Sequence, residues 1–242
     1  MIKKVVIAAA GQGTRMKHLS KNKSKHLICV EHKPFLAYLL DNLKEAGYTE
    51  FILVVGFRAD LMDEFLKEYN FKATVVNQFD ILGPKEKEYG TLCPIKCIKD
   101  IVGDENFLAV YGDNLYSVND LQAMNIDDDY TYVAGLTHSH PEKYGVLFTD
   151  DGFLKEIIEK PKEYVGNLIN TGLYKFTSEV FNKIPQVKLS SRGELELTDA
   201  ISLLAREGKV KVKKLQDEWL DFGNPGDVMK LSRFLKKCKK NA

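Results

Sequence analysis

A stretch near the N-terminus combines glycine residues with a run of positive charge. Residues 8–27 read AAAGQGTRMKHLSKNKSKHL and directly follow an apolar run at residues 5–7. The stretch has neither the second apolar run that a hairpin needs nor the apolar face of a helix. Its basic side chains are Arg15, Lys17, Lys21, Lys23 and Lys25, with His18 and His26 between them. Glycines that expose backbone N–H groups, followed by full positive charges, favour the binding of a polyanion.

The chain as a whole carries almost no net charge, so any attraction for phosphate must be local. Its 242 residues include 35 basic and 34 acidic side chains, for a net charge of +1. This balance argues against a general nucleic-acid binder, and the aromatic residues are too scattered to form a base-stacking platform. No apolar run approaches the length of a membrane span, and the N-terminus lacks a signal sequence. We therefore expect no nucleic-acid partner, no membrane partner and a cytoplasmic location.

Cysteine and histidine residues do not form a recognisable metal site or disulfide framework. The four cysteines contain no CxxC pair and are Cys29, Cys93, Cys97 and Cys238. We expect them to be free or buried thiols. His138 and His140 would share one face of a strand, but the sequence offers no third ligand beside them. Solvated histidines are the better interpretation of that pair.

The elements that must position the basic stretch alternate between strands and helices. Apolar runs at residues 3–9, 51–56, 72–77 and 107–114 predict buried strands, the last of which runs out at Gly112. Helical spacing predicts helices over residues 34–46 and 60–69. Because the strands are apolar throughout rather than alternating, they predict a mostly parallel sheet with both faces covered. Ligands of such sheets bind beyond the carboxyl ends of the strands, where the basic stretch begins.

The second half of the chain is richer in strands. Residues 130–137, 144–149, 153–160 and 168–176 are strand-like, a helix follows over 195–207, a strand over 209–215, and a last helix begins at Pro225. We find no linker, repeat or low-complexity segment. The sequence therefore predicts a single domain over residues 1–242, whose N-terminal half has the pattern of nucleotide-binding folds and whose second half is richer in strands.

Two common phosphate-binding motifs can be tested directly. The Walker pattern GxxxxGK[ST] does not occur, and the dinucleotide pattern GxGxxG fails because its third glycine position holds Met16. Gly11 and Gly13 alone are also compatible with an ordinary turn. The first motif therefore needs support from elsewhere in the chain.

Seven blocks in chain order provide that support. They read GQGTRM…LS…SKHL, YGDN (111–114), EKYGVL (142–147), EKP (159–161), NTGLYKF (170–176), RGELELTDAI (192–201) and WLDFGNP (219–225). Together they resemble the sugar-1-phosphate nucleotidyltransferases, or NDP-sugar pyrophosphorylases, and in particular the short glucose-1-phosphate thymidylyl- and uridylyltransferases. The resemblance implies a three-layer α/β/α Rossmann-like fold with a mixed, mostly parallel central sheet.

The sequence departs from this family at three places. His18 and Ser24 stand where members usually have proline, and the usual GTA of the base-contacting loop reads Gly90-Thr91-Leu92, which leaves the choice of base open. The sequence also ends soon after the last block, so we expect no C-terminal left-handed β-helix of the kind found in longer relatives.

The resemblance implies the reaction of an NTP with a sugar 1-phosphate to give an NDP-sugar and pyrophosphate. This reaction needs no protein nucleophile, but it needs two mutually repelling anions to be held together and neutralised. The implied catalytic residues are Arg15, Lys25 and Asp113. The implied nucleotide-binding residues are Ala10, Gly11, Gly13, Thr14, Arg15, Gln78, Gly90 and Thr91. Lys17, Lys21 and Lys23 would form a solvated edge that attracts anions.

The resemblance also implies a sugar-phosphate site and a metal site. The sugar-phosphate residues are Tyr144, Gly145, Glu159, Lys160, Asn170 and Thr171. Asp113 and Asp221 would hold Mg²⁺, which prefers hard oxygen ligands and usually takes one or two protein carboxylates. Glu196 could serve either as a sugar contact or as a charge at a helix N-terminus.

Substrate identity is less clear than reaction class. The block RGELELTDAI favours dTTP or UTP with glucose 1-phosphate, whereas KPFLAYLLDNL (33–43) is similar to guanylyltransferases for mannose or heptose phosphates. A non-catalytic regulatory homologue is a third hypothesis. It is disfavoured because the charged residues Arg15, Lys25, Asp113, Lys160 and Asp221 are all present. Family members form dimers and tetramers, so a homo-oligomer is possible.

Overall fold

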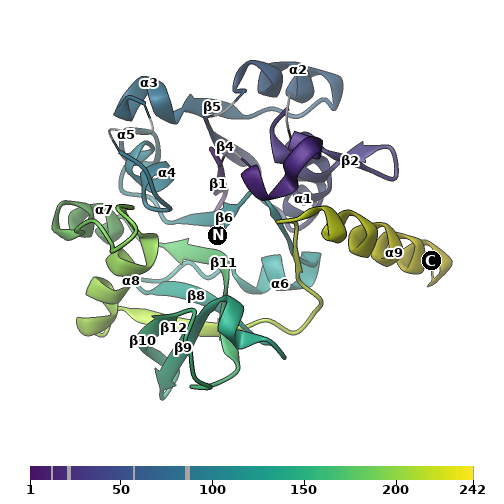
Figure 1. The fold of residues 1–242 in the computed structure, drawn as a ribbon. Coiled ribbons are helices and arrows are strands. Elements are labelled where there is room, and N and C mark those ends of the chain that lie inside the picture. Colours follow the sequence, from purple (N-terminus) through teal and green to yellow (C-terminus); the bar gives the residue numbers. More distant parts are fainter. Residues whose placement is uncertain (12, 21–22, 57, 85–87, 242) are drawn as a thin grey trace.

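The fold is built around one long mixed sheet, seen in a computed structural model that describes residues 1–11, 13–20, 23–56, 58–84 and 88–241 (Figure 1). Within these residues the sheet has nine strands in the order β5-β4-β1-β6-β11-β8-β12-β10-β9. The strands are β1 (Lys4–Ala9), β4 (Glu50–Val55), β5 (Thr74–Asn77), β6 (Phe107–Tyr111), β8 (Thr131–Thr137), β9 (Gly145–Asp150), β10 (Phe153–Glu159), β11 (Leu168–Phe176) and β12 (Val210–Lys214).

The strands that the first half of the chain contributes to this sheet are all parallel to one another. Strand β1 lies between β4 and β6, with Val6 opposite Ile52 on one side and Ala109 on the other. Strand β11 is antiparallel to β6 and to β8, β12 is parallel to β8, and β10 is antiparallel to both β12 and β9. Of the nine strands in the described sheet, only β10 and β11 therefore run opposite to the rest. The expected mixed, mostly parallel sheet is confirmed.

Alternate side chains of the strands enter two separate cores, one on each face of the sheet. Val5 and Ile7 of β1 belong to one core and Val6 belongs to the other. Helices α1 (Phe35–Glu45), α2 (Asp60–Glu68), α6 (Val118–Ala123) and α9 (Pro225–Asn241) cover the first face. Helices α4 (Cys93–Lys96), α5 (Lys99–Val102), α7 (Glu179–Lys183) and α8 (Leu197–Arg206) cover the second (Figure 1). The expected three-layer α/β/α arrangement is confirmed.

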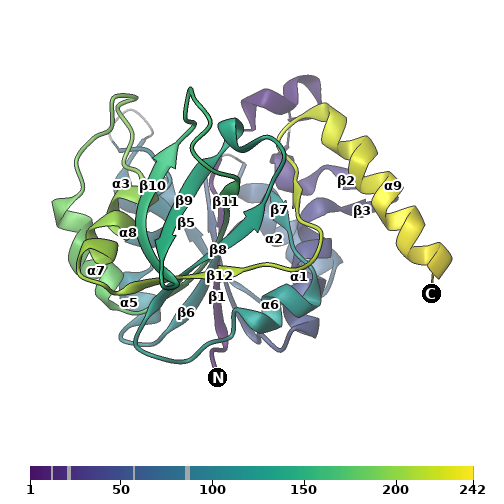
Figure 2. The same cartoon turned by 90° about the horizontal axis from the view of Figure 1, so that it is seen from below.

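The longer helices follow from their sequence pattern. In α1 the apolar residues recur at helical spacing and are buried, and the helix starts directly after Pro34. Gly47 follows it with a φ of 98°, the left-handed conformation in which glycine commonly ends a helix. Helix α9 contacts β2 (Cys29–Val30) and then extends away from the body of the molecule (Figure 2). None of the helices in the described ranges is both long and apolar enough to cross a membrane.

The prediction that the strand beginning at residue 107 runs out at Gly112 is confirmed. Strand β6 stops at Tyr111, and Asn114 begins a separate strand, β7 (Asn114–Leu115). Gly112 still donates its N–H to the carbonyl of Ala8 in β1 at 2.9 Å, and the chain then leaves the main sheet. Strand β7 then pairs antiparallel with β13 (Leu220–Asp221), more than a hundred residues later. This small ladder, outside the main sheet, positions two of the predicted site residues.

Candidate active site

A cavity of about 600 Å³ lies beyond the carboxyl ends of β1 and β6 and is lined by both halves of the chain. It brings together most of the residues that the sequence singled out. These are Ala10, Gly11, Arg15, Lys25, Gln78, Gly90, Thr91, Asp113, Tyr144, Gly145, Glu159, Lys160, Asn170, Thr171 and Asp221. Gly13 is not part of its lining, and the side chain of Thr14 lies outside the described part of the structure. A Cβ atom at Gly13 would lie 2.9 Å from Cβ of Lys25, so Gly13 allows the Lys25 side chain to pack against the loop.

Lys25 and Asp113 form an ion pair on the wall of this cavity. Lys25 opens the short 3-10 helix at Lys25–Leu27, and Asp113 lies in the turn between β6 and β7. Their side chains are 11% and 16% exposed, and Nζ of Lys25 donates to Oδ2 of Asp113. Burial by itself raises the pKa of Asp113, but the nearby charge of Lys25 and its hydrogen bond hold that pKa below the ordinary value. The carboxyl group is therefore ionised at neutral pH.

His26 lies behind this pair and is neutral. Its ring is buried, and Nδ1 lies 2.7 Å from the hydroxyl oxygen of Ser24. Burial and the charge of Lys25 lower the pKa of His26 to about 3. His26 is therefore neither a cation for phosphate nor a base poised near neutral pH.

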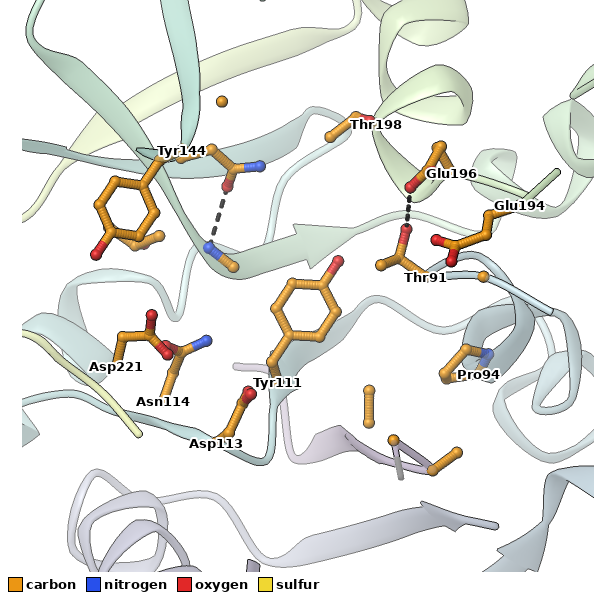
Figure 3. A pocket seen from close by; sticks show the side chains of 18 of the residues that line it. Thr91, Pro94, Tyr111, Asp113, Asn114, Tyr144, Glu194, Glu196, Thr198 and Asp221 are labelled. Carbon is orange, nitrogen blue, oxygen red and sulfur yellow. Dashed lines mark hydrogen bonds between the residues drawn. The ribbon is translucent and has the colours of Figure 1, made fainter. Parts of the chain in front are cut away.

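Asp221 reaches the same end of the cavity through the β7–β13 ladder. It lies opposite Asn114, and the N–H of Phe222 donates to the carbonyl of Asp113 at 2.8 Å. Figure 3 shows Asp113, Asn114 and Asp221 gathered on one side of the cavity. Burial raises the pKa of Asp221 to about 6, and the charge of Asp113 acts in the same direction.

The groups at this end fit a hard divalent cation. Asp113 and Asp221 supply two carboxylates, and the buried Oδ1 of Asn114 has no hydrogen-bond partner among the described residues. Two carboxylates and an amide oxygen are hard oxygen ligands that suit Mg²⁺, with phosphate and water completing the coordination. Within the described chain, no group of three or more His, Cys, Asp and Glu residues is arranged to hold a metal. The fit therefore depends on oxygen ligands from a bound substrate.

Arg15 also lies at this end. Its guanidinium group packs over Gly223, where a Cβ atom would lie 3.6 Å from Cζ and Nη1. The Arg15 charge lowers the raised pKa of Asp221, as does that of Lys25. Arg15 and Lys25, the basic residues of the first motif that were expected to be catalytic, thus act on this pair of carboxylates. Lys21, another basic residue of that motif, lies outside the described residues.

Thr91 lies on the opposite side of the cavity (Figure 3), and Gln78 and Gly90 also line the cavity. Gln78 is the first residue of α3 (Gln78–Leu82), directly after β5, and its buried Oε1 has no partner within the described residues. Gly90 has a φ of 140°, and a Cβ atom there would lie 2.1 Å from the carbonyl oxygen of Leu195. Only glycine fits at this position without moving the backbone.

The predicted sugar-phosphate residues form the remaining wall. Lys160 follows the end of β10 with a φ of 45°, and Gly145 begins β9. A Cβ atom at Gly145 would lie 2.9 Å from Oε1 of Glu159, so glycine leaves room for that carboxylate. Asn170 donates to the hydroxyl of Tyr174 at 2.9 Å. Thr171 is buried and donates to the carbonyl of Ala134 at 3.1 Å, so its hydroxyl shapes the wall.

Residues 4–238 match the family model described as nucleotidyl transferase. The chain belongs to the nucleotidyl transferase family. It is 32% identical over 233 residues to the bifunctional sugar-1-phosphate nucleotidylyltransferase/acetyltransferase of Sulfurisphaera tokodaii, covering 96% of this chain and 55% of that protein. It is also 32% identical over 231 residues to the UTP–glucose-1-phosphate uridylyltransferase AglF of Haloferax volcanii, covering 92% of both. The chain spans about half the length of the bifunctional relatives that it matches.

Solved structures of this family have the same fold. A putative glucose-1-phosphate thymidylyltransferase from Bacillus anthracis aligns with a TM-score of 0.78 and 26% identity, covering 96% of this chain and 94% of that chain. A UDP-glucose pyrophosphorylase solved with UDP-glucose aligns with a TM-score of 0.84 and 22% identity, covering 98% and 99%. The second likeness is evidence for the fold alone.

The nucleotidyl transferase blocks also contain cavity residues that sequence reasoning did not single out. Tyr111 and Asn114 come from YGDN, Trp219 from WLDFGNP, and Arg192 and Glu194 from RGELELTDAI, so their motifs were a usable signal. Tyr89 and Pro94 belong to none of the blocks. Gly172 has a φ of 78°, and a Cβ atom there would lie 2.3 Å from the Tyr111 ring. This glycine therefore makes room for the Tyr111 side chain in the cavity wall.

Glu196 lies both at the N-terminus of α8 and in the lining of the cavity, so its location is compatible with either of the two roles that the sequence left open. It is the N-cap residue of α8, although its side chain makes no hydrogen bond to that helix, and it also lines the cavity. Its carboxylate instead accepts hydrogen bonds from Thr91, Ser190 and Arg192 at 3.2, 3.2 and 2.8 Å.

Proposed function

We propose that this chain transfers a nucleotidyl group from an NTP to a sugar 1-phosphate and releases pyrophosphate. The observation that carries this proposal is the convergence of Arg15, Lys25, Asp113 and Asp221 at one end of a cavity whose other walls contain Gln78 and Lys160. Two anionic substrates can bind there side by side, because basic side chains are available to neutralise their phosphates and carboxylates are available to hold a cation. A phosphate oxygen of the sugar phosphate attacks the α-phosphorus, and the bond from that phosphorus to the bridging oxygen breaks. Pyrophosphate leaves with the electron pair of that bond.

The residues have separate parts in this proposal. Arg15 and the loop at Ala10 and Gly11 bind the phosphates that leave as pyrophosphate. Lys25 neutralises charge at the α-phosphate, and Lys160 binds the phosphate of the sugar. The protein contributes positioning and charge, and neutral His26 agrees with a reaction that needs no histidine base.

Mg²⁺ is the proposed cofactor, with Asp113 and Asp221 as its ligands. When bound, it would neutralise the phosphate oxygens around the reacting phosphorus. Lys25 is the residue that balances the charge of Asp113 in the structure, which agrees with a site made for a cation.

We favour UTP or dTTP with glucose 1-phosphate. The printed names of the Haloferax volcanii relative and the Bacillus anthracis neighbour include these uridylyl and thymidylyl transfers. The unpaired Oε1 of Gln78 would accept the N3–H of uracil or thymine, whereas the corresponding ring nitrogens of cytosine and adenine carry no hydrogen. Guanine does offer an N1–H, so a guanylyltransferase acting on mannose or heptose phosphate is the alternative. A cytoplasmic location and a homo-oligomer stay predictions.

A substrate panel tests the proposal. Pyrophosphate release is measured with UTP, dTTP, GTP, CTP and ATP, each against glucose, N-acetylglucosamine, mannose and heptose 1-phosphates, with Mg²⁺. We expect the highest kcat/KM for UTP or dTTP with glucose 1-phosphate. The highest value for GTP would support the alternative, and no release with any pair would support a non-catalytic homologue.

A further inference from the structure

Two loops that belong to different subsites in the proposed function are hydrogen-bonded to each other. The N–H of Leu195 donates to the carbonyl of Tyr89 at 2.9 Å, and the N–H of Leu92 donates to the carbonyl of Leu195 at 3.0 Å. Residues 89–92 contain Gly90, the glycine expected to contact the base, and Glu194, Glu196 and Thr198 line the cavity beside them. Gly90 allows this close approach because its missing Cβ would overlap the backbone of Leu195.

The hydroxyl of Thr91 forms the centre of this connection. It accepts a hydrogen bond from the N–H of Leu197 at 2.9 Å and donates to Oε2 of Glu196 at 3.2 Å (Figure 3). Leu197 is the first residue of α8, and the first N–H groups of a helix have no partner within it. The Glu196 side chain does not cap the helix, so Thr91 satisfies this donor from 106 residues away in the sequence.

The same hydroxyl holds Glu196, whose charge, like that of Arg192, acts on the pKa of Glu159 in the proposed sugar-phosphate subsite. The other oxygen of that carboxylate accepts from Arg192 at 2.8 Å and from Ser190 at 3.2 Å. A threonine hydroxyl has one proton, and here it is used within the protein. Thr91 can therefore contact a base through its backbone, but its hydroxyl has no proton left for one.

We propose that Thr91 is a positioning residue that couples the nucleotide subsite to the sugar-phosphate subsite. This inference rests on the proposed function. A nucleotide that packs against Gly90 and Thr91 fixes the loop, and the loop in turn fixes Glu196 and Arg192 beside it, within electrostatic reach of Glu159. Each substrate therefore raises the affinity for the other. The ratio of the affinity for one substrate with and without the other bound is the coupling factor, and by linkage it is the same for both substrates.

Trp219 supplies a direct measurement of binding without turnover. It is the one tryptophan of the chain and lines the cavity, with its ring 5.3 Å from that of Tyr144. Its fluorescence is titrated with the sugar 1-phosphate chosen by the panel, with and without the α,β-methylene analogue of the chosen NTP. We expect the analogue to tighten sugar-phosphate binding by about tenfold, within the usual range for coupled sites.

Three substitutions separate coupling from general disturbance. Thr91→Val keeps the shape and removes the hydroxyl, and we expect it to reduce the coupling factor to about two or less. Thr91→Ser restores the hydroxyl, and we expect it to keep most of the factor. Thr131→Val is the matched control because Thr131 is buried, lies outside the cavity, and has a hydroxyl without a partner in the described structure. It should leave the factor at the wild-type value.

The proposal is overturned if wild-type protein shows no coupling, or if Thr91→Val retains it. It is also overturned if Thr91→Val weakens nucleotide binding alone and the factor is unchanged, because the hydroxyl would then serve the base. If Thr91→Val does not fold, as judged by circular dichroism, Glu196→Ala takes its place and must reduce the factor. Failure of the proposed function is distinct: it appears as no pyrophosphate release from the wild-type protein in the panel.

Discussion

The side chains of Lys25 and Asp113, which are 88 residues apart in the sequence, are joined by an ion pair at one end of the cavity. Each group lies in a largely buried position and compensates the charge of the other. Removing either one leaves the remaining charge without its partner, which is more costly in a buried site than at the surface. Substitutions at this end therefore need controls that report on folding as well as activity.

Replacing Lys25 with alanine tests its part in the chemical step. If Lys25 stabilises charge that develops during attack on the α-phosphorus, Lys25→Ala should lower kcat by on the order of a hundredfold, with a smaller effect on the KM for NTP. Steady-state pyrophosphate release gives both constants. Lys23→Ala, in the same segment but outside the cavity lining, should retain kcat within about twofold. An unchanged kcat for Lys25→Ala would remove this residue from the catalytic set.

Replacing Lys160 is expected to affect the KM for one substrate much more than the KM for the other. Lys160→Ala should raise the KM for sugar 1-phosphate by at least about tenfold and change the KM for NTP little, because only one ligand loses a paired charge. Lys162→Ala is the matched control, since Lys162 is exposed and absent from the cavity lining. Equal increases in both KM values would place Lys160 outside the sugar-phosphate subsite.

Metal removal tests Asp113 and Asp221. We expect no turnover in EDTA and recovery on addition of Mg²⁺ or Mn²⁺, because two carboxylates at one site repel each other without a cation. Asp113→Asn and Asp221→Asn should each abolish most activity and weaken Mn²⁺ binding in a calorimetric titration by at least about tenfold. Asp151→Asn, at an exposed turn, should change neither the activity nor the affinity for Mn²⁺. Wild-type Mn²⁺ affinity in either site variant would exclude that residue as a ligand.

Lys175 is expected to matter for stability rather than for the reaction. Its side chain is fully buried and donates to the carbonyl of Tyr130 at 2.6 Å, and also to the carbonyl and the carboxylate of Asp128. Lys175→Met keeps the apolar stem but removes the donor to both carbonyls and the charge that pairs with the Asp128 carboxylate. Urea denaturation should show a free energy of unfolding lower by about 1–3 kcal/mol. The exposed control Lys155→Met should change it by less than about 0.5 kcal/mol, and equal stabilities would contradict the role given to Lys175.

The regular elements were predictable because their patterns are local. Strand β11 covers residues 168–176 as predicted, and α1 begins and ends within one residue of its prediction. Long apolar runs and helical spacing suffice for such elements. The sequence analysis did not predict the short helices α3 to α7, because segments of four to six residues are too short to show a period.

By itself, the sequence determined the fold class, the family and most of the residues that line the cavity, since these follow from local apolar patterns and from motifs read in order. Only the tertiary structure decided how those residues meet. It set Asp221 opposite Asn114, paired Lys25 with Asp113, and directed the Thr91 hydroxyl to the first turn of α8. Each of these contacts joins segments about a hundred residues apart. Local patterns contain no information about such partners, because the partners are selected by the order and direction of strands in the sheet.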